Sequence, residues 1–282
     1  MKKLLLTTII TTIFTFIGSL FLFEYLDNRN QDGAIYASIK SEFMNEKREF
    51  IITLPESYQY NKSKEYPVMF VLDGSSQDHH IAYKGAILAS INAAEEFITV
   101  GIPNTRGNRS RDLTPSNMKI DLENPKSKTG NGDRFLSFIE KELIPYIDKN
   151  YRATSHRMFS GNSRGGLLVM HAFLKKSTLF DAYFCYSPAF WRENQKIVSE
   201  TAAFLNKKDS LNTFLYISLG KDENEKMKRG FTAMESVLKK HKVKGLNWKS
   251  ALTPHANHST NAYLSSPMAI KQWGSHFKNI NE

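Results

Sequence analysis

A serine flanked by glycines stands where a predicted strand meets a predicted helix. Residues 159–166 read FSGNSRGG, and Gly161 to Gly165 fit the pattern G-x-S-x-G. The run RMFS predicts the end of a strand, and LLVMHAFLKK predicts a helix. A serine on such a turn is exposed at the carboxyl edge of a sheet, where the N–H groups of the helix can stabilise an oxyanion. We therefore predict that Ser163 is a nucleophile rather than a serine in an ordinary tight turn.

A nucleophilic serine needs a histidine as its base, and the histidine needs an acid that orients it. Of the five histidines that follow Ser163, three lie in predicted helices. The other two, His255 and His258, lie in the polar loop TPHANHST, directly after a predicted strand. Either of them could reach back over the sheet edge to the serine.

The segment SLGKDENEKM follows another predicted strand and offers three candidate acids. These are Asp222, Glu223 and Glu225, of which at least two must belong to a solvated turn. Serine, acid and histidine then follow one another in the chain order that parallel-sheet hydrolases use. All three parts fall at the carboxyl ends of predicted strands, which favours a hydrolase.

An oxyanion hole requires two N–H donors. The residue after the nucleophile supplies the first, which is the backbone N–H of Arg164. The second comes from the loop after an early strand, here VLDGSS, so the N–H of Ser75 or Gly74 is the candidate.

Buried strands alternate with amphipathic helices along the chain. YPVMFVLDG (66–74) and FITVGI (97–102) are short apolar runs typical of strands buried on both faces, and 133–149 has helical spacing of its apolar residues. We predict an α/β fold with a mainly parallel sheet and helices on both faces, in one domain from 41 to 282. Residues 28–40 are interpreted as a linker.

The N-terminus carries an apolar run from Leu4 to Phe23, preceded by Lys2 and Lys3. Such a run is long enough to span a bilayer as a helix, and it also fits a long signal peptide. No small-residue cleavage pattern follows it, so 1–27 is predicted as an uncleaved signal anchor. The lysines then stay in the cytoplasm, and the domain is expected in the periplasm, anchored to the inner membrane or secreted.

The composition of the chain excludes only some classes of binding partner. The net charge is +10, but no arginine-rich tail or zinc-finger spacing accompanies it, so nucleic acid is not predicted as a partner. The lone Cys185 lies in an apolar strand and is predicted as a core residue. Asp78, His79 and His80 are adjacent but lack helical i, i+4 ligand spacing and a third clear ligand, so no metal site is predicted.

Seven segments together resemble the esterase D and enterochelin-esterase-like branch of the α/β-hydrolases. They are FIITLPESY, YPVMFVLDG, VGIPNTRGNRSRDLTP, FIEKELIPYIDKNY, GNSRGG, YSPAFW and HANHST, in this order along the chain. The resemblance implies the α/β-hydrolase fold and serine ester hydrolysis without a metal or an organic cofactor.

Site residues follow from the resemblance by position. It implies Ser163 as the nucleophile, His258 as the general base and Glu223 as the acid. It places the RDLTP segment that begins at Arg111 beside the active site, where this arginine is expected to bind substrate. SPAFW resembles the segment that brings an aromatic ring, here Trp191, to the acyl or leaving-group pocket.

The chain departs from the family pattern at two points. Asn162 stands where the family often has histidine, which is expected to alter packing and not catalysis. The acid region carries an extra residue, so Asp222 and Glu225 stay open beside Glu223 as the third member.

The substrate is less defined than the reaction. The family includes esterases that open ferric catecholate siderophores, which are polyanions, and Arg106, Arg109 and Arg111 in one loop would suit such a ligand. The alternative is a solvated loop in which Arg111 pairs with Asp112. Carbohydrate-linked esters and small acyl esters fit equally well. An acyltransferase of the same fold and a non-catalytic binding protein stay open as alternative functions.

Overall fold

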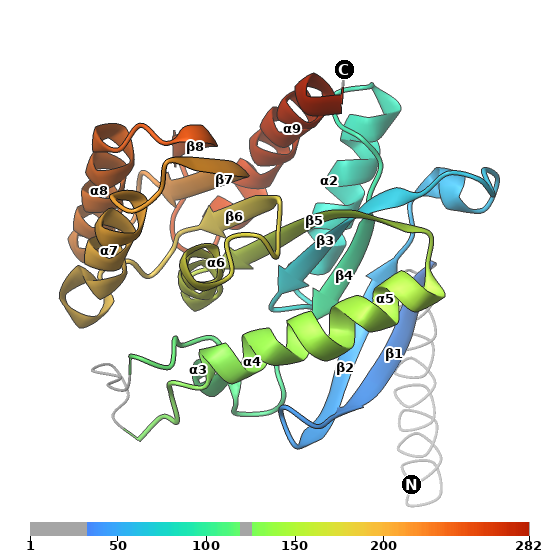
Figure 1. Cartoon of the computed structure of the whole chain (residues 1–282), viewed down its shortest axis with the longest axis horizontal. Coiled ribbons are helices and arrows are strands. Elements are labelled where there is room, and N and C mark those ends of the chain that lie inside the picture. Colours follow the sequence, from blue (N-terminus) through green and yellow to red (C-terminus); the bar gives the residue numbers. More distant parts are fainter. Residues whose placement is uncertain (1–32, 119–125, 282) are drawn as a thin grey trace, which may run out of the picture. The chain divides into compact units, whose positions relative to one another are not determined.

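The computed structural model describes residues 33–118 and 126–281. The chain divides into two units, Met1–Ile35 and Tyr36–Glu282, and almost all of the described secondary structure belongs to the second. One eight-stranded sheet runs through it (Figure 1). The strands are β1 (Ala34–Ser41), β2 (Glu46–Thr53), β3 (Tyr66–Leu72), β4 (Ile98–Ile102), β5 (Ala153–Asn162), β6 (Ala182–Tyr186), β7 (Ser210–Gly220) and β8 (Lys244–Thr253).

The strand order is β1-β2-β4-β3-β5-β6-β7-β8. β2 is antiparallel to β4, whereas β4, β3, β5, β6, β7 and β8 run parallel to one another. The carboxyl ends of these six strands therefore share one edge of the sheet, and the loops that follow them can meet there. This confirms the predicted α/β class with its mainly parallel sheet.

The residues of β3 alternate between two hydrophobic cores, because successive side chains of a strand point to opposite faces. Val68, Phe70 and Leu72 belong to one core, and Met69 and Val71 to the other. All seven residues of the strand are buried. This explains why the sequence of the strand is a continuous apolar run rather than an alternating one.

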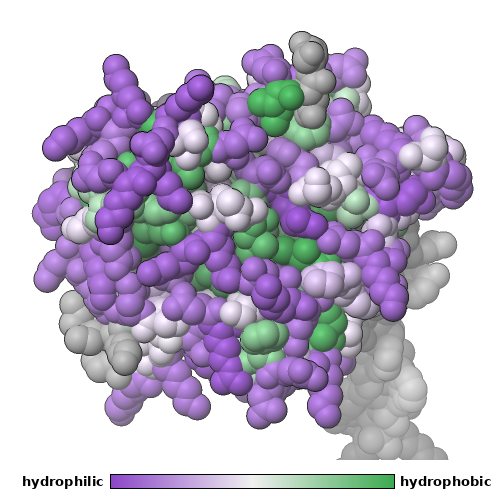
Figure 2. Space-filling view, in the orientation of Figure 1, coloured by the Kyte–Doolittle hydropathy of each residue, from purple (hydrophilic) through white to green (hydrophobic). Residues whose placement is uncertain are grey.

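Helices pack on both faces of the sheet. α2 (Asp78–Ser90) and α9 (Asn261–Asn281) enclose the smaller core with β3 and its neighbours. The larger core lies under other helical segments. They are α4 (Gly132–Phe138), the π-helical turn η2 (Ile139–Leu143), α5 (Ile144–Asn150), α6 (Arg164–Lys175), α7 (Arg192–Leu205) and α8 (Glu225–Lys240). In Figure 1 the short α3 (Arg109–Asp112) lies beside the start of α4. In the space-filling view hydrophilic residues cover most of the visible face, with smaller hydrophobic areas between them (Figure 2).

The structure differs from the sequence-based expectations in two places. β1 occupies 34–41 and overlaps the end of the segment interpreted as a linker, because Ala37 and Ile39 alternate with polar residues and pack against the larger core. The helix expected at 133–149 is three consecutive helical pieces that include the π turn η2.

The predicted signal anchor at 1–27 lies outside the described residues. Within 33–118 and 126–281, no helix has both the length and the apolar character that a membrane crossing requires.

Candidate active site

Ser163 occupies a sharp turn between β5 and α6. Its φ of 60° and ψ of −115° are unfavourable for a residue with a side chain. Backbone hydrogen bonds hold the turn: Ser163 N–H donates to the carbonyl of Tyr186 (2.9 Å), and Ser163 C=O accepts from the N–H groups of Leu167 (3.1 Å) and Ala189 (3.0 Å). The serine is thus fixed at the carboxyl end of β5 and the N-terminus of α6.

Gly161 is required by the closeness of the backbone around this turn. A Cβ at this position would lie 2.5 Å from the carbonyl carbon of Gly165 and 2.7 Å from its oxygen. Both groups are backbone, so neither can move aside without opening the turn. The first glycine of the motif therefore has a steric function.

Three side chains form a continuous hydrogen-bonded chain. Nε2 of His258 lies 2.9 Å from Oγ of Ser163, and Nδ1 of His258 lies 2.8 Å from Oε2 of Glu223. The Glu223 side chain is fully buried, whereas that of His258 is 45% exposed. The carboxylate can therefore accept from Nδ1–H and leave Nε2 as the acceptor that faces the serine.

Buried donors hold the carboxylate of Glu223. Its Oε1 accepts from the hydroxyl of Ser187 (2.5 Å) and from the N–H of Gly220 (3.1 Å). The other two candidate acids lie elsewhere: Asp222 is exposed, and Glu225 begins α8 and pairs with a lysine one turn later. Of the three, the structure brings Glu223 to the histidine.

Ser187 and Asn261 are site residues that the sequence reasoning missed. Nδ2 of Asn261 donates to Oγ of Ser187 (3.0 Å) and to Oγ of Ser218 (3.2 Å), and all three residues are buried. Ser187 belongs to the segment SPAFW, which was singled out for its aromatic ring. Its left-handed φ of 42° is a feature that only the structure reveals.

The loop that carries His258 is held by the residue before it. Oδ1 of Asn257 accepts from the N–H groups of Ser259 (2.9 Å) and Thr260 (3.2 Å), and the N–H of Asn257 donates to Oγ1 of Thr260 (3.0 Å). Asparagine favours such turns because its short side chain can replace a backbone acceptor. His255 is two positions outside this turn and is exposed.

The candidate oxyanion donors belong to two segments, the start of α6 and the loop after β3. Arg164 is the first residue of α6, where N–H groups have no partner within the helix. In the other loop, the N–H of Gly74 donates to Ile102, and those of Ser76 and Gln77 donate to Asp73.

For the Ser75 N–H, no bond to a backbone carbonyl in a turn or loop is found among the described residues. Burial raises the pKa of Asp78, and the N–H groups of Asp78, Ser75 and His79 counteract this in part. The Ser75 N–H thus interacts with the Asp78 carboxylate, and a substrate oxyanion would share this donor with it.

Arg109 connects the loop after β4 to the elbow. Its Nε and one terminal nitrogen pair with the carboxylate of Asp73 (2.6 and 2.7 Å), and the same nitrogen lies 3.4 Å from the carbonyl oxygen of Asn162. Burial lowers the pKa of Arg109, but the hydrogen bonds to Asp73 outweigh it and the pKa is raised. Arg109 stays protonated and supports the backbone next to Ser163.

Arg111 has carboxylate partners on two sides. Its Nε lies 2.6 Å from Asp112, and another nitrogen lies 2.7 Å from Glu46. The fully buried Arg48 joins the cluster, 2.8 Å from each of the same two carboxylates. The pairing of Arg111 with Asp112, which the sequence left open as an alternative, is thus the observed arrangement, and substrate binding by Arg111 stays a prediction.

Trp191 lines a cavity of about 360 Å³ together with Asn194, Gln195, Lys226 and Arg229. The ammonium of Lys226 lies 4.1 Å from the centre of the tryptophan ring. Lys226 and Arg229 make the cavity basic, and they follow Glu223 closely in the chain. This cavity combines an aromatic face with positive charge.

The other side chains that the sequence offered as reactive groups or metal ligands lie among packing contacts. Cys185 is buried, and burial raises the pKa of its thiol. Asp78 is buried at the start of α2, and the ring of His80 packs in a tilted arrangement against that of Tyr263, with the ring centres 4.2 Å apart. Within the described ranges, no group of three or more histidine, cysteine or acidic side chains is arranged to hold a metal ion.

A parallel sheet with a serine elbow at its carboxyl edge, facing a histidine and a buried acid, defines the α/β-hydrolase class. Within that class the chain belongs to the esterase family described as "putative esterase", which matches residues 41–280. The family that the seven segments resembled is thereby confirmed.

Known relatives carry siderophore esterase names. The chain is 28% identical to a siderophore triacetylfusarinine C esterase of Aspergillus fumigatus over 153 residues, which are 50% of either chain. It is 33% identical to a siderophore enterobactin esterase of Emericella nidulans over 122 residues, 39% of this chain and 40% of the relative. The chain thus spans half or less of the length of these two relatives.

A solved structure matches over a longer stretch. The crystal structure of an IroE-like serine hydrolase from Shewanella oneidensis superposes with a TM-score of 0.80 at 28% identity. The match covers 86% of this chain and 81% of that one. The fold of the described residues is therefore that of a known serine hydrolase almost throughout.

Proposed function

We propose that this protein hydrolyses carboxylic esters through an acyl-enzyme, with Ser163 as nucleophile, His258 as general base and Glu223 as the orienting acid. The observation that carries the proposal is the hydrogen-bonded chain from Ser163 through His258 to Glu223 at a strained elbow. A strained serine bonded to a histidine, with a buried carboxylate behind it, matches the requirements for an activated nucleophile.

In the proposed mechanism Oγ of Ser163 attacks the ester carbonyl while Nε2 of His258 takes the hydroxyl proton. The carboxylate of Glu223 stabilises the imidazolium, and the N–H groups of Arg164 and Ser75 hold the oxyanion. The imidazolium then protonates the leaving alkoxide, and the C–O bond breaks. Water repeats the sequence on the acyl-enzyme, releasing the acid and restoring the serine.

We propose siderophore-type esters with anionic aromatic groups as the substrate class. The basic cavity around Trp191 supports this, since its ring can stack on an aromatic group while Lys226 and Arg229 neutralise negative charge. The names of the two relatives support siderophore esters as the wider class. Arg229→Gln should raise KM for a catecholate trilactone and leave kcat/KM for p-nitrophenyl acetate unchanged.

The first test is hydrolysis of p-nitrophenyl acetate and butyrate by the wild type and Ser163→Ala, with fluorophosphonate labelling of both. The wild type should be labelled and active, and the variant should lose labelling together with kcat by on the order of 10⁴-fold. Folded wild type that is neither labelled nor active would favour the binding-protein alternative. Release of an ester of an added alcohol, in place of the free acid, would favour the acyltransferase.

We also propose that residues 1–27 attach the protein to the inner membrane, with the hydrolase domain in the periplasm. The apolar run and its two preceding lysines support this orientation. Fractionation of cells that express the full chain tests it. Recovery of the protein in the cytoplasmic fraction would contradict the proposal.

A further inference from the structure

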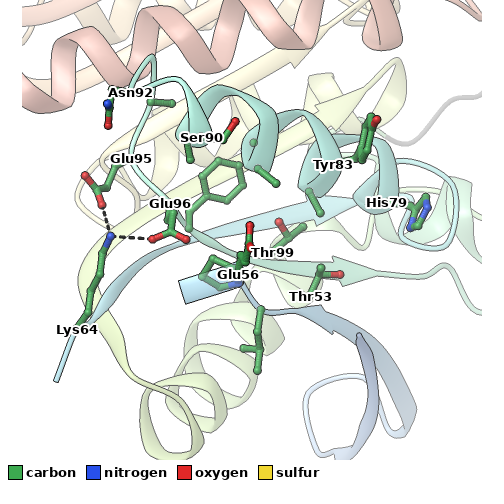
Figure 3. A pocket seen from close by; sticks show the side chains of 18 residues that line it. Thr53, Glu56, Lys64, His79, Tyr83, Ser90, Asn92, Glu95, Glu96 and Thr99 are labelled. Atoms are coloured by element: carbon green, nitrogen blue, oxygen red, sulfur yellow. Dashed lines mark hydrogen bonds and ion pairs between the residues drawn. The ribbon is translucent and has the colours of Figure 1, made fainter. Parts of the chain in front are cut away.

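A cavity of about 450 Å³ lies between α2 and the neighbouring ends of β2 and β4, and the residues of the Ser163 site are not among those that line it (Figure 3). Its volume falls in the range of roughly 300–1,000 Å³ that is typical of small-molecule sites. Much of its wall is apolar. The apolar lining residues are Leu54, Pro55, Ala82, Ala86, Ala89, Ala94 and Phe97, with Tyr83 at the wall and 66% exposed.

The charged residues of this cavity are predominantly acidic. Glu95 and Glu96 share one cation, Lys64, whose ammonium lies 2.7 and 2.9 Å from their oxygens (Figure 3). Glu56 also lines the cavity, and no described residue forms an ion pair with it. Three carboxylates and one ammonium thus line this cavity, in a chain whose net charge is +10.

The pKa values of the paired residues agree with strong pairing at this end. Burial would lower the pKa of Lys64, but its hydrogen bonds to Glu95 and Glu96 outweigh burial and raise it. Burial would raise the pKa of Glu96, but hydrogen bonds from Ser57 and Lys64 lower it. Lys64 and Glu96 are therefore both charged at neutral pH.

Thr99 provides an independent sign of a ligand. It lies on β4 opposite Thr53 and is 1% exposed, and its hydroxyl has no hydrogen-bond partner among the described residues. A buried hydroxyl without a partner costs about 1–3 kcal/mol. A polar group of a ligand in the cavity would satisfy this hydroxyl.

We propose that this cavity binds a small organic cation, a primary amine on an apolar body. An ammonium group has three donors and no acceptor, which suits the carboxylates and the oxygen of Thr99. Its hydrocarbon part would bury itself against the alanines of α2 and Phe97. An anionic ligand would instead meet three carboxylates, while Lys64 is already paired twice. This site is separate from the proposed ester hydrolysis and does not depend on it.

Calorimetric titration of the full chain with three probes of one shape tests the charge preference. The probes are 4-phenylbutylamine, 4-phenylbutanol and 4-phenylbutanoate. The amine should bind about fivefold or more tightly than the alcohol, and the carboxylate should bind most weakly. Equal affinities, no binding of the amine, or tightest binding of the carboxylate would overturn the proposal.

Thr99→Val separates a ligand-binding hydroxyl from a structural one. The substitution keeps the shape and removes the unpaired oxygen, so the Tm should stay the same or rise. The affinity for the amine should fall by about 2- to 12-fold, the equivalent of one hydrogen bond. Unchanged affinity would contradict the assigned role of Thr99.

Two further variants locate the bound amine. Glu56→Gln should weaken binding by about 2- to 5-fold. Glu49→Gln is the matched control, because Glu49 is 68% exposed and pairs with Lys47 away from the cavity, so it should have no effect. Ser163→Ala should bind the amine as the wild type does. Loss of amine binding in this last variant would place the amine at the catalytic serine and overturn the proposal.

Discussion

Replacing Glu223 by glutamine tests the proposed triad most directly, because the amide keeps the size of the carboxylate. In the structure Oε1 of Glu223 accepts two hydrogen bonds, from Ser187 and from Gly220, and Oε2 faces Nδ1 of His258. Glutamine has one carbonyl oxygen. If this oxygen takes the position of Oε1, the NH₂ group faces His258 and makes Nδ1 an acceptor. The proton then resides on Nε2, which can no longer accept from Ser163.

The opposite amide orientation restores the productive tautomer at a cost. The NH₂ group would then face the N–H of Gly220, which cannot turn away, although the hydroxyl of Ser187 can rotate to accept. An unsatisfied buried donor costs about 1–3 kcal/mol, so roughly 1 in 5 to 1 in 150 variant molecules would hold the amide in this productive orientation. Loss of the negative charge that stabilises the imidazolium adds to this. We therefore expect kcat to fall by about 10²- to 10⁴-fold.

The assay is steady-state hydrolysis of p-nitrophenyl butyrate, with the Tm of each variant as a control for folding. Asp222→Asn and Glu225→Gln are matched controls, since they remove one nearby charge without touching His258, and both should keep wild-type kcat. A folded Glu223→Gln variant with more than a tenth of wild-type kcat would refute the assignment of Glu223 as the orienting acid.

Three other changes have defined outcomes. Asn257→Ala removes the turn that holds His258, so kcat should fall by about 10-fold or more while KM changes little; wild-type kcat in this variant would show that the loop is held by other contacts. Gly161→Ala forces a Cβ against the backbone of Gly165 and should destabilise the fold by about 1–3 kcal/mol in urea unfolding; an unchanged midpoint would contradict the steric argument. Burial, followed by nearby Lys84, lowers the pKa of His80 from 6.5 to about 3, so the unfolded chain binds a proton between these pH values that the folded chain does not. The free energy of unfolding that depends on neutral His80 is fully present above about pH 6.5 and falls by about 2 kcal/mol at pH 5. The Tm of His80→Gln should therefore drop less than that of the wild type between pH 7 and pH 5. An equal drop in both proteins would argue against a neutral His80 imidazole in the folded chain.

The sequence predicted the parts of the site that depend on local pattern and chain order. The strand–serine–helix join around Ser163 is a local feature, and the carboxyl ends of parallel strands lie on one edge of the sheet. This was enough to narrow the base to His255 or His258 and the acid to a set that included Glu223, and the family resemblance then pointed to His258. The identity of the family also followed from short segments and is confirmed by its match to residues 41–280.

The choice among the three acids depended on the conformation of one turn. The N–H of Asp222 donates to the carbonyl of Ala256, and the N–H of Glu223 donates to that of Gly220. These bonds leave Asp222 exposed and bury Glu223 against the histidine. A difference of one residue in a turn cannot be read from composition or spacing.

The sequence by itself thus determined most of the element types, the elbow, the order of the catalytic candidates and the family, because these depend on neighbours along the chain. Only the tertiary structure decided which acid meets His258, that Ser187 and Asn261 support it, and that a second, acidic cavity lies beside Thr99. These features join residues many positions apart; Ser187 and Asn261, for example, are 74 positions apart. Their contacts arise from the packing of strands and helices around two cores, and a linear pattern contains no measure of such distances.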